Sequence, residues 1–213
     1  GNAYRCFASN EELEEIRQKS GSYLYPRLWR DRSKEEVGAK ILNKDKHTIR
    51  MRIPVEGDIS FEDLVYGKIN TKCSELDDFI IARSDGSPTY NLTVVVDDND
   101  MNISHVIRGE DHISNTPKQM LIYKALGWTM PKFGHLPMIL GSDGKRLSKR
   151  HGAKGTSEYK DLGYLPDTLI NYLALLGWNP GNDDEIFDFD YLQENFSLDK
   201  VNKKSAVFDT IKL

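Results

Sequence analysis

The segment Gly144–Ala153, with the sequence GKRLSKRHGA, concentrates positive charge in a form that suits phosphate. It holds four Lys or Arg residues and one His, and no acidic residue balances them. Lysine supplies a mobile point charge, while serine hydroxyls and backbone N–H groups add hydrogen bonds to phosphate oxygens. Composition alone favours an ordinary solvated basic turn, because most charge runs are surface features. The segment also lacks the glycine spacing and Gly-Lys-Ser/Thr ending of a Walker A loop.

A second cluster of chemically capable residues lies at Ile103–His112, with the sequence ISHVIRGEDH. A strand that ends at Arg108 and Gly109 places its last side chains at the carboxyl edge of a sheet, where ligands of open α/β sheets bind. Arg108 could hold a carboxylate through a two-pronged ion pair, with Asp111 and His112 beside it. A charged helix start explains the same residues equally well.

Three further side chains are weaker candidates when each is taken alone. The turn Asp85–Tyr90 delivers the hydroxyl of Tyr90, which suits a pocket wall but also a packed tyrosine. His105 and His135 stand among apolar neighbours, and we expect both to be hydrogen-bonded structural histidines.

The elements that must position these residues follow from periodicity and from capping signals. Ser9 and Ser33 each precede a Glu three residues on, which predicts helix starts. Apolar residues at helical spacing predict helices over 117–126, ending at Gly127, and from Pro166 to Gly177. Alternation and β propensity predict strands at 49–53, 64–69, 79–82, 94–96, 104–108 and 133–140.

Composition and charge limit the class of protein. The 213 residues are 38% hydrophobic and 29% charged, which is typical of a globular chain. No apolar run approaches the roughly 20 residues that cross a bilayer, so we expect a cytoplasmic protein without membrane contact. The net charge of −4 is unevenly spread, because residues 26–52 hold nine Lys or Arg and four acids. Cys6 and Cys73 lie far apart and predict free thiols.

Several short motifs occur in an ordered set whose spacing is more specific than any single member. Taken together they resemble the bacterial-type glutamyl-tRNA synthetases of class I, over nearly the whole chain. The motifs are Asp85–Asn91, Val94–Asp98, His105–His112 with Asn115–Pro117, Arg146–Arg150, Tyr164–Pro166, Asn171–Leu173 and Leu176–Trp178.

The resemblance implies an α/β fold, the second half of a class I Rossmann-like nucleotide-binding fold. Residues 1–84 would be an α+β insertion that binds the tRNA acceptor end. Residues 85–154 would complete the second half of the catalytic domain, and residues 155–213 would begin a helical stem-contact region. The family also places Tyr90 to about Asp98 on a helix, and we adopt that expectation over the strand at 94–96.

The resemblance further implies activation of L-glutamate with ATP and Mg²⁺, then transfer to tRNA(Glu), by a protein that acts as a monomer. Residues 146–150 would be the mobile second signature loop, with Lys149 neutralising the ATP phosphates. The resemblance assigns catalysis to Lys149, Ser148 and Arg150. It assigns ATP binding to Lys149, Arg146 and Leu147. Glutamate would be bound by Arg108, Tyr90, Asp111 and Val94, and tRNA by a basic face of Arg27, Arg30, Arg50 and Arg52.

Two departures from the family pattern carry expectations of their own. The first class I signature and the first half of the nucleotide-binding fold are absent from the sequence, so we expect a central fragment without independent activity. Ala8 stands where some members have the second cysteine of a Cys-x-Cys zinc motif, so no zinc is expected. A paralogue of the glutamyl-queuosine type, or a tRNA acceptor-binding module without activity, remains an alternative interpretation.

Overall fold

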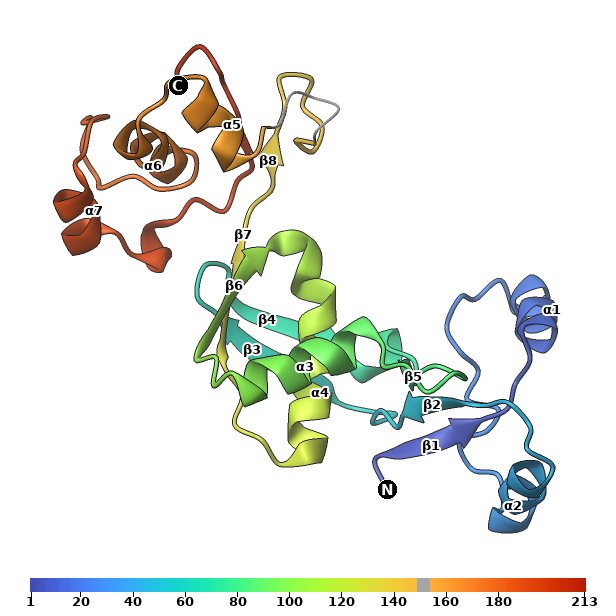
Figure 1. The fold of residues 1–213 in the computed structure, drawn as a ribbon. Helices are drawn as coiled ribbons and strands as arrows, with labels where there is room; N and C mark the ends of the chain where they lie inside the picture. Colours follow the sequence, from blue (N-terminus) through green and yellow to red (C-terminus); the bar gives the residue numbers. More distant parts are fainter. Residues whose placement is uncertain (149–153) are drawn as a thin grey trace. The chain divides into compact units, whose positions relative to one another are not determined.

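The computed structural model describes residues 1–148 and 154–213, which form two compact units (Figure 1). The units interleave along the sequence, so each is assembled from several segments. Unit 1 comprises residues 1–61, 70–104 and 114–131, and unit 2 comprises residues 62–69, 105–113 and 132–213.

Unit 1 contains a three-stranded antiparallel sheet in the order β1-β2-β5. The middle strand carries alternating Ile49 and Met51, as expected, but it is shorter than predicted because pairing ends at Met51. The strands are β1 (Ala3–Cys6), β2 (Thr48–Met51) and β5 (Ile80–Ala82).

Predicted capping residues begin the first two helices of unit 1 and end the first of them. Ser9 Oγ accepts a hydrogen bond from Glu12 N, and Gly21 closes the first helix in the left-handed region. Ser33 and Glu36 complete a reciprocal capping box. The helices are α1 (Asn10–Ser20), α2 (Lys34–Leu42), α3 (Tyr90–Asp100) and α4 (Thr116–Leu126), with a short 3₁₀ turn at Cys73–Glu75.

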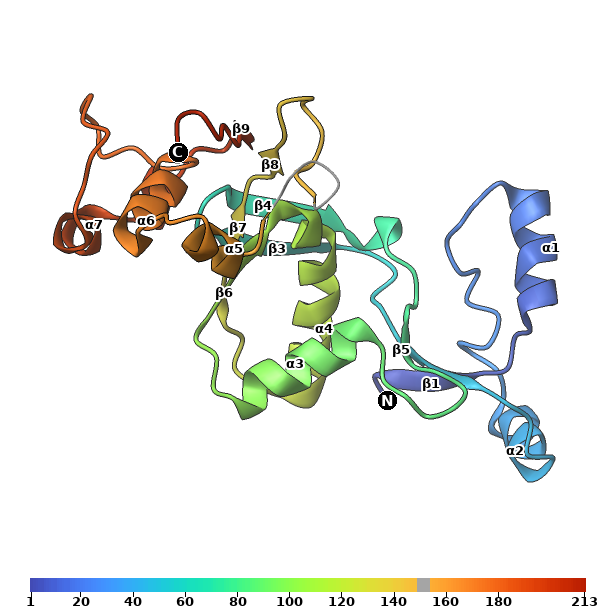
Figure 2. The ribbon, with the colours of Figure 1, turned by 45° about the horizontal axis from the view of Figure 1, so that its top comes forward.

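Helices α3 and α4 lie against each other and share the main core of unit 1, as Figures 1 and 2 both show. The core includes Val95 of α3 and Ile122 and Tyr123 of α4, packed with Ile53 and Phe79. Helix α3 confirms the family-based expectation for Tyr90 to Asp98, and the strand predicted at 94–96 from β propensity is wrong. Packing of Val95 decides the helix where local propensity does not.

A four-stranded sheet has the order β4-β3-β7-β6. Strand β7 runs parallel to both β3 and β6, whereas β3 and β4 are joined by the three-residue turn 64–66, which requires an antiparallel pair. The sheet is therefore mixed. Its strands are β3 (Asp58–Asp63), β4 (Gly67–Lys72), β6 (His105–Gly109) and β7 (Lys132–Leu136).

Two predicted strands need correction. The apolar run 64–69 is not one strand, because Asp63 Oδ1 accepts hydrogen bonds from Val65 N and Tyr66 N and so closes a turn there. The predicted strand 133–140 is two strands, interrupted at Pro137, which has no N–H to donate to a ladder. The strand expected at 104–108 is confirmed as β6.

In the rest of unit 2 the longer regular elements are helices, and this part has its own core around Trp178. Val65, Phe187, Leu192 and Val201 pack there. The elements are β8 (Ile139–Leu140), α5 (Thr156–Asp161), α6 (Pro166–Leu175), α7 (Phe189–Asn195) and β9 (Ala206–Val207), with 3₁₀ turns at Glu110–Asn115 and Leu198–Lys200. Among the described helices none has the length and apolar character needed to span a bilayer.

Candidate functional site

The parallel pair β6 and β7 places Arg108 at a sheet edge, opposite His135 in the register. The residue lies one position before the end of β6, at the carboxyl edge where open α/β sheets bind ligands. Its guanidinium carbon lies 5.9 Å from the centre of the Phe133 ring, and its Nε donates to His135 Nε2 at 3.2 Å. The predicted carboxylate-binding arginine is thus half-buried, and its Nε is bonded to His135.

His135 is fully buried and bonds on both sides of its ring. Its Nδ1 lies 2.6 Å from Asp63 Oδ2, while its Nε2 faces Arg108. The expectation of a hydrogen-bonded buried histidine is confirmed for His135. Its bond to Asp63 was not predictable from the sequence, because Asp63 lies 72 positions away along the chain.

The ionisation of this pair follows from its surroundings. Burial lowers the pKa of His135 and outweighs the opposing effect of Asp63, with Arg108 and His112 lowering it further. Burial acts to raise the pKa of Asp63, yet hydrogen bonds from Tyr66 N, the His135 ring and Val65 N bring it below its usual value. The pair is therefore a carboxylate beside a neutral imidazole.

Asp111 and Arg146, both predicted site residues, lie together in unit 2. Arg146 Nη1 is 3.0 Å from Asp111 Oδ2. A Cβ at Gly109 would lie 2.6 Å from Asp111 Oδ1, so a larger residue there would displace that carboxylate. Arg146 is thereby tied to the residues that follow β6 by a partly exposed ion pair.

The start of the basic loop is a tight turn after β8. Gly141 N donates to the Lys145 carbonyl, Gly144 adopts the left-handed φ of 72°, and Leu147 N donates back to the Ile139 carbonyl. Leu147 and Ser148 are half-buried and Arg146 is exposed. Lys149 and Arg150, the other two predicted loop residues, lie outside the described residues.

Tyr90 and Val94 lie in unit 1, on the first turns of α3. Tyr90 is 48% exposed and Val94 is half-buried. They share one helix face, because residues four apart in a helix are neighbours. Arg108 and Asp111 belong to unit 2, so each half of the predicted glutamate site is described within its own unit.

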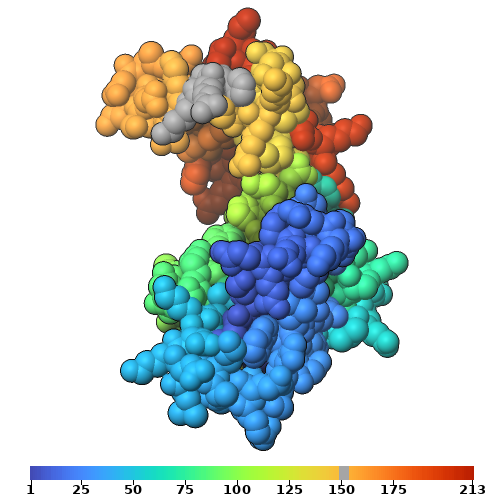
Figure 3. Space-filling model, turned by 90° about the vertical axis from the view of Figure 1, so that its right-hand side faces the viewer, coloured from blue at the N-terminus to red at the C-terminus, as the bar shows by residue number. Residues whose placement is uncertain are grey.

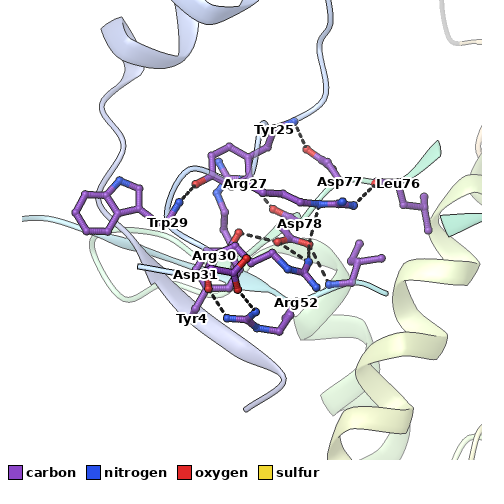
Figure 4. A network of polar contacts seen from close by, with 12 residues as sticks. Tyr4, Tyr25, Arg27, Trp29, Arg30, Asp31, Arg52, Leu76, Asp77 and Asp78 are labelled. Atoms are coloured by element: carbon purple, nitrogen blue, oxygen red, sulfur yellow. Dashed lines mark hydrogen bonds and ion pairs between the residues drawn. The ribbon is translucent and has the colours of Figure 1, made fainter. Parts of the chain in front are cut away.

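The four predicted tRNA-binding arginines surround the buried Asp78 or lie close to it, and Figure 4 shows Arg27, Arg30 and Arg52 there. Arg30 Nη1 lies 2.7 Å from Asp78 Oδ1, and Arg27 Nε lies 3.7 Å from the same oxygen. Arg50 donates to the Asp78 carbonyl at 2.7 Å. Arg52 instead pairs with Asp31 at 2.8 Å.

The expectation of a basic outer face is wrong for Arg50, which is 6% exposed. Its guanidinium carbon lies 3.6 Å from the centre of the Tyr25 ring, so the segment around Tyr25 covers the side of β2 that alternation assigns to solvent. The burial of Arg50 could not be predicted from the sequence. Tyr25 lies outside the strand, and the alternation at 49–53 gives no sign of a segment packed against its polar side.

Both cysteines are buried. Cys6 Sγ lies 3.2 Å from Tyr25 Oη, and Cys73 begins a 3₁₀ turn. Within residues 1–148 and 154–213, no three His, Cys, Asp or Glu side chains are grouped as a metal would require.

Comparison with known proteins places the chain in one family. The family model described as "tRNA synthetases class I (E and Q), catalytic domain" matches residues 1–213. The glutamate--tRNA ligase of Thermodesulfovibrio yellowstonii is 53% identical over 213 residues, and that of Nitrosospira multiformis is 50% identical over 217. Each alignment covers 100% of this chain and 45% of the relative, so the chain spans less than half the length of these curated relatives.

Solved structures agree with the sequence relatives. A glutamate tRNA ligase from Elizabethkingia meningosepticum, in complex with its amino acid, superposes with a TM-score of 0.86 at 33% identity. The match covers 99% of this chain and 48% of that one. With its mixed-sheet α/β fold, the chain belongs to the class I tRNA synthetases (E and Q) and is part of their catalytic domain.

Proposed function

We propose that the chain is the central part of a glutamate–tRNA ligase. The complete enzyme would activate L-glutamate with ATP, forming glutamyl-adenylate and diphosphate, and would then transfer glutamate to the 3′ end of tRNA(Glu). The family match, the curated relatives and the structural neighbours support this reaction. In finer detail, residues 85–154 would be the second half of the Rossmann-like catalytic domain.

Glutamate would be selected by its side-chain carboxylate at Arg108. Because His135 takes up Nε, the carboxylate would be bound by the Nη atoms of the guanidinium. Tyr90, Val94 and Asp111 would complete the glutamate site. Asp111 has a second part in this proposal, because its ion pair with Arg146 couples the glutamate site to the phosphate-binding loop.

ATP would be bound by the loop that follows β8. Arg146 and Leu147 would contact the nucleotide, and Lys149 would stabilise the negative charge that develops on the phosphates as glutamate attacks the α-phosphate. Ser148 and Arg150 would assist Lys149. Mg²⁺ would arrive with ATP as part of the substrate, because its preferred ligands are phosphate and water oxygens.

The tRNA acceptor end would be bound by residues 1–84, and residues 155–213 would begin the stem-contact region. Arg27, Arg30 and Arg52 would contribute positive charge to this surface, although part of that charge compensates Asp78 and Asp31. Arg50 would support the surface from inside. Figure 3 shows residues 1 to about 50 in blue on the face of unit 1 that this proposal assigns to tRNA. The complete protein would act as a cytoplasmic monomer.

The placement of Arg108 at the carboxyl edge of β6 carries the proposal, and glutamate-dependent exchange of pyrophosphate into ATP tests it. In the full-length enzyme, Arg108→Ala should lower kcat/KM for glutamate at least about 100-fold, because a buried charge-assisted pair is lost. Arg83→Ala is the matched control, since the Arg83 guanidinium bonds within its own turn, to Ser87 and the Pro88 carbonyl, and its loss should leave glutamate use unchanged. Unchanged glutamate use by Arg108→Ala would refute the assignment of the pocket.

The same assay on the 213-residue chain separates an enzyme fragment from a tRNA-binding module. We expect no exchange from the chain alone and full exchange from the complete protein. Absence of exchange from the complete protein would favour the module. Attachment of glutamate to a modified tRNA base in place of the 3′ end would favour the glutamyl-queuosine-type alternative.

A further inference from the structure

The contacts of His135 assign the proton on its ring without reference to any measured pKa. Arg108 Nε carries a hydrogen and can only donate, so His135 Nε2 must accept. The hydrogen of the neutral ring therefore sits on Nδ1, which donates to Asp63 Oδ2 at 2.6 Å. The three side chains form one directed chain of hydrogen bonds, from Arg108 to His135 to Asp63.

Asp63 is in turn fixed by the backbone. Its Oδ1 accepts from Val65 N and Tyr66 N at 2.9 Å each, and from His135 N at 3.3 Å. One carboxylate oxygen is therefore committed to backbone donors, and only Oδ2 is left to face the imidazole. Asp63 is 4% exposed and His135 is 0% exposed, so water does not compete for these bonds.

These hydrogen bonds orient Arg108 through a neutral group. A carboxylate in direct contact would compensate the guanidinium charge, whereas a neutral imidazole accepts one hydrogen bond and adds no negative charge at Nε. Holding Nε fixes the plane of the guanidinium and lowers the rotamer entropy lost when a substrate binds. Stacking near Phe133 restrains the same group.

We infer that Asp63 and His135 are positioning residues that hold Arg108 in the orientation required to select glutamate by its side-chain carboxylate. The inference rests on the proposed function, in which Arg108 binds that carboxylate. Neither residue touches substrate in this arrangement, and each acts through the next.

Asp63→Asn tests the inference with a change of a single atom. The three backbone donors at Oδ1 require an oxygen, so the new NH₂ group must take the place of Oδ2 and face His135 Nδ1. The ring must then carry its proton on Nε2, where it opposes the donor Arg108 Nε. The contact that positions Arg108 becomes a repulsion, while the packing volume stays the same.

In the full-length enzyme, we expect Asp63→Asn to raise KM for glutamate about 10- to 100-fold, as for loss of a hydrogen bond to a charged group. KM for ATP should stay within about twofold. The ring ¹⁵N shifts of His135 in the 213-residue chain should report a change from the Nδ1–H to the Nε2–H tautomer. An unchanged tautomer, or an unchanged KM for glutamate with an inverted tautomer, would overturn the inference.

A pair of substitutions at position 135 keeps the test valid if Asp63→Asn does not fold. The amide of His135→Gln reaches the place of Nε2 and can accept from Arg108, whereas the shorter His135→Asn reaches only the place of Nδ1 and bonds Asp63. We expect His135→Gln to keep KM for glutamate within about fivefold and His135→Asn to raise it about 10-fold or more. Equal KM values for the two would show a merely structural histidine.

Arg108→Ala, measured alongside, separates the two proposals. Loss of glutamate use by Arg108→Ala with normal KM in all three positioning variants would refute the positioning role alone. Normal glutamate use by Arg108→Ala would refute the proposed pocket, and with it the inference.

Discussion

Two buried aspartates engage arginine in opposite ways in the two units. In unit 1, Asp78 contacts Arg30 directly, has Arg27 nearby, and also accepts from Tyr4 Oη and Ile53 N. In unit 2, Asp63 bonds His135, and the neutral ring of His135 accepts from Arg108. Direct contact uses arginine charge to hold the fold, whereas the interposed imidazole transmits orientation and adds no opposing charge. The same residue type thus holds the fold in unit 1 and, under the proposal above, orients the glutamate-binding arginine in unit 2.

The largest expected effect is on the directly paired side. Asp78→Asn leaves the guanidinium groups of Arg27 and Arg30 without their carboxylate in a buried setting, and should lower the free energy of unfolding by about 3–5 kcal/mol. Chemical denaturation of the chain measures this. Asp77→Asn is the matched neighbour, since Asp77 accepts a hydrogen bond from Tyr25 N, and the substitution should cost about 1 kcal/mol. Equal costs for the two substitutions would mean that Asp78 is not the centre of the network.

Replacing one arginine in each unit with methionine should sharpen the contrast between the two aspartates. Arg30→Met removes a charged partner of Asp78 and should cost about 1.5–3 kcal/mol of unfolding free energy. Arg108→Met removes a hydrogen bond to a neutral ring, which contributes about 0.5–1.5 kcal/mol, and should cost less than Arg30→Met. Thermal and denaturant unfolding of both variants give the comparison. A greater loss from Arg108→Met would show that Arg108 is primarily structural.

A third prediction concerns acid sensitivity. The pKa of His135 in the folded chain lies below 6.5. Above that pH the ring is therefore neutral in both the folded and the unfolded chain, and its contribution to the free energy of unfolding is fully present. As pH falls below 6.5, the unfolded chain takes up a proton that the folded chain resists, and stability falls by at most about 1.4 kcal/mol per pH unit.

The stability difference between wild type and His135→Gln should therefore shrink as the pH is lowered from 7 to 5. Urea titrations at each pH measure it, and His105→Gln on the exposed start of β6 is the control. A difference that grows on acidification would indicate that the folded chain prefers the protonated ring.

The smallest effect is expected at the rim of the arginine cluster. Arg52 pairs with Asp31, whose side chain is 80% exposed. Water screens such a pair, so Asp31→Asn should change the free energy of unfolding by less than about 0.5–1 kcal/mol. The same denaturation assay applies, and a loss comparable with that of Asp78→Asn would remove the distinction between centre and rim.

Local signals in the sequence located the elements well. Ser9 and Gly21 bound α1, Gly127 closes α4, and the strand predicted before Gly109 is β6. Each of these depends on hydrogen bonds between residues a few positions apart, which residue types encode directly.

Contacts between distant segments were not predictable in the same way. No residue near Arg50 in the sequence indicates that Tyr25 covers it, and none near His135 indicates a contact with Asp63. The motif around Arg108 indicated the residue that would bind a carboxylate. The side chains bonded in line with it come from other parts of the chain. The parallel register of β6 and β7 brings His135 opposite Arg108, and the β3–β7 pairing brings Asp63 to His135.

The interleaving of the two units bears on how the chain is made. Residues 62–69 belong with residues 105–113 and 132–213, so Asp63 leaves the ribosome 72 positions before its partner His135. At typical elongation rates that wait is on the order of 4–14 s. During that interval a carboxylate destined for burial remains in water, and the edge of β3 that pairs with β7 has no partner yet. Slow translation between these two positions would lengthen the time for which the unpaired edge of β3 is exposed. A chaperone would therefore prevent the most aggregation if it bound the nascent chain during this interval.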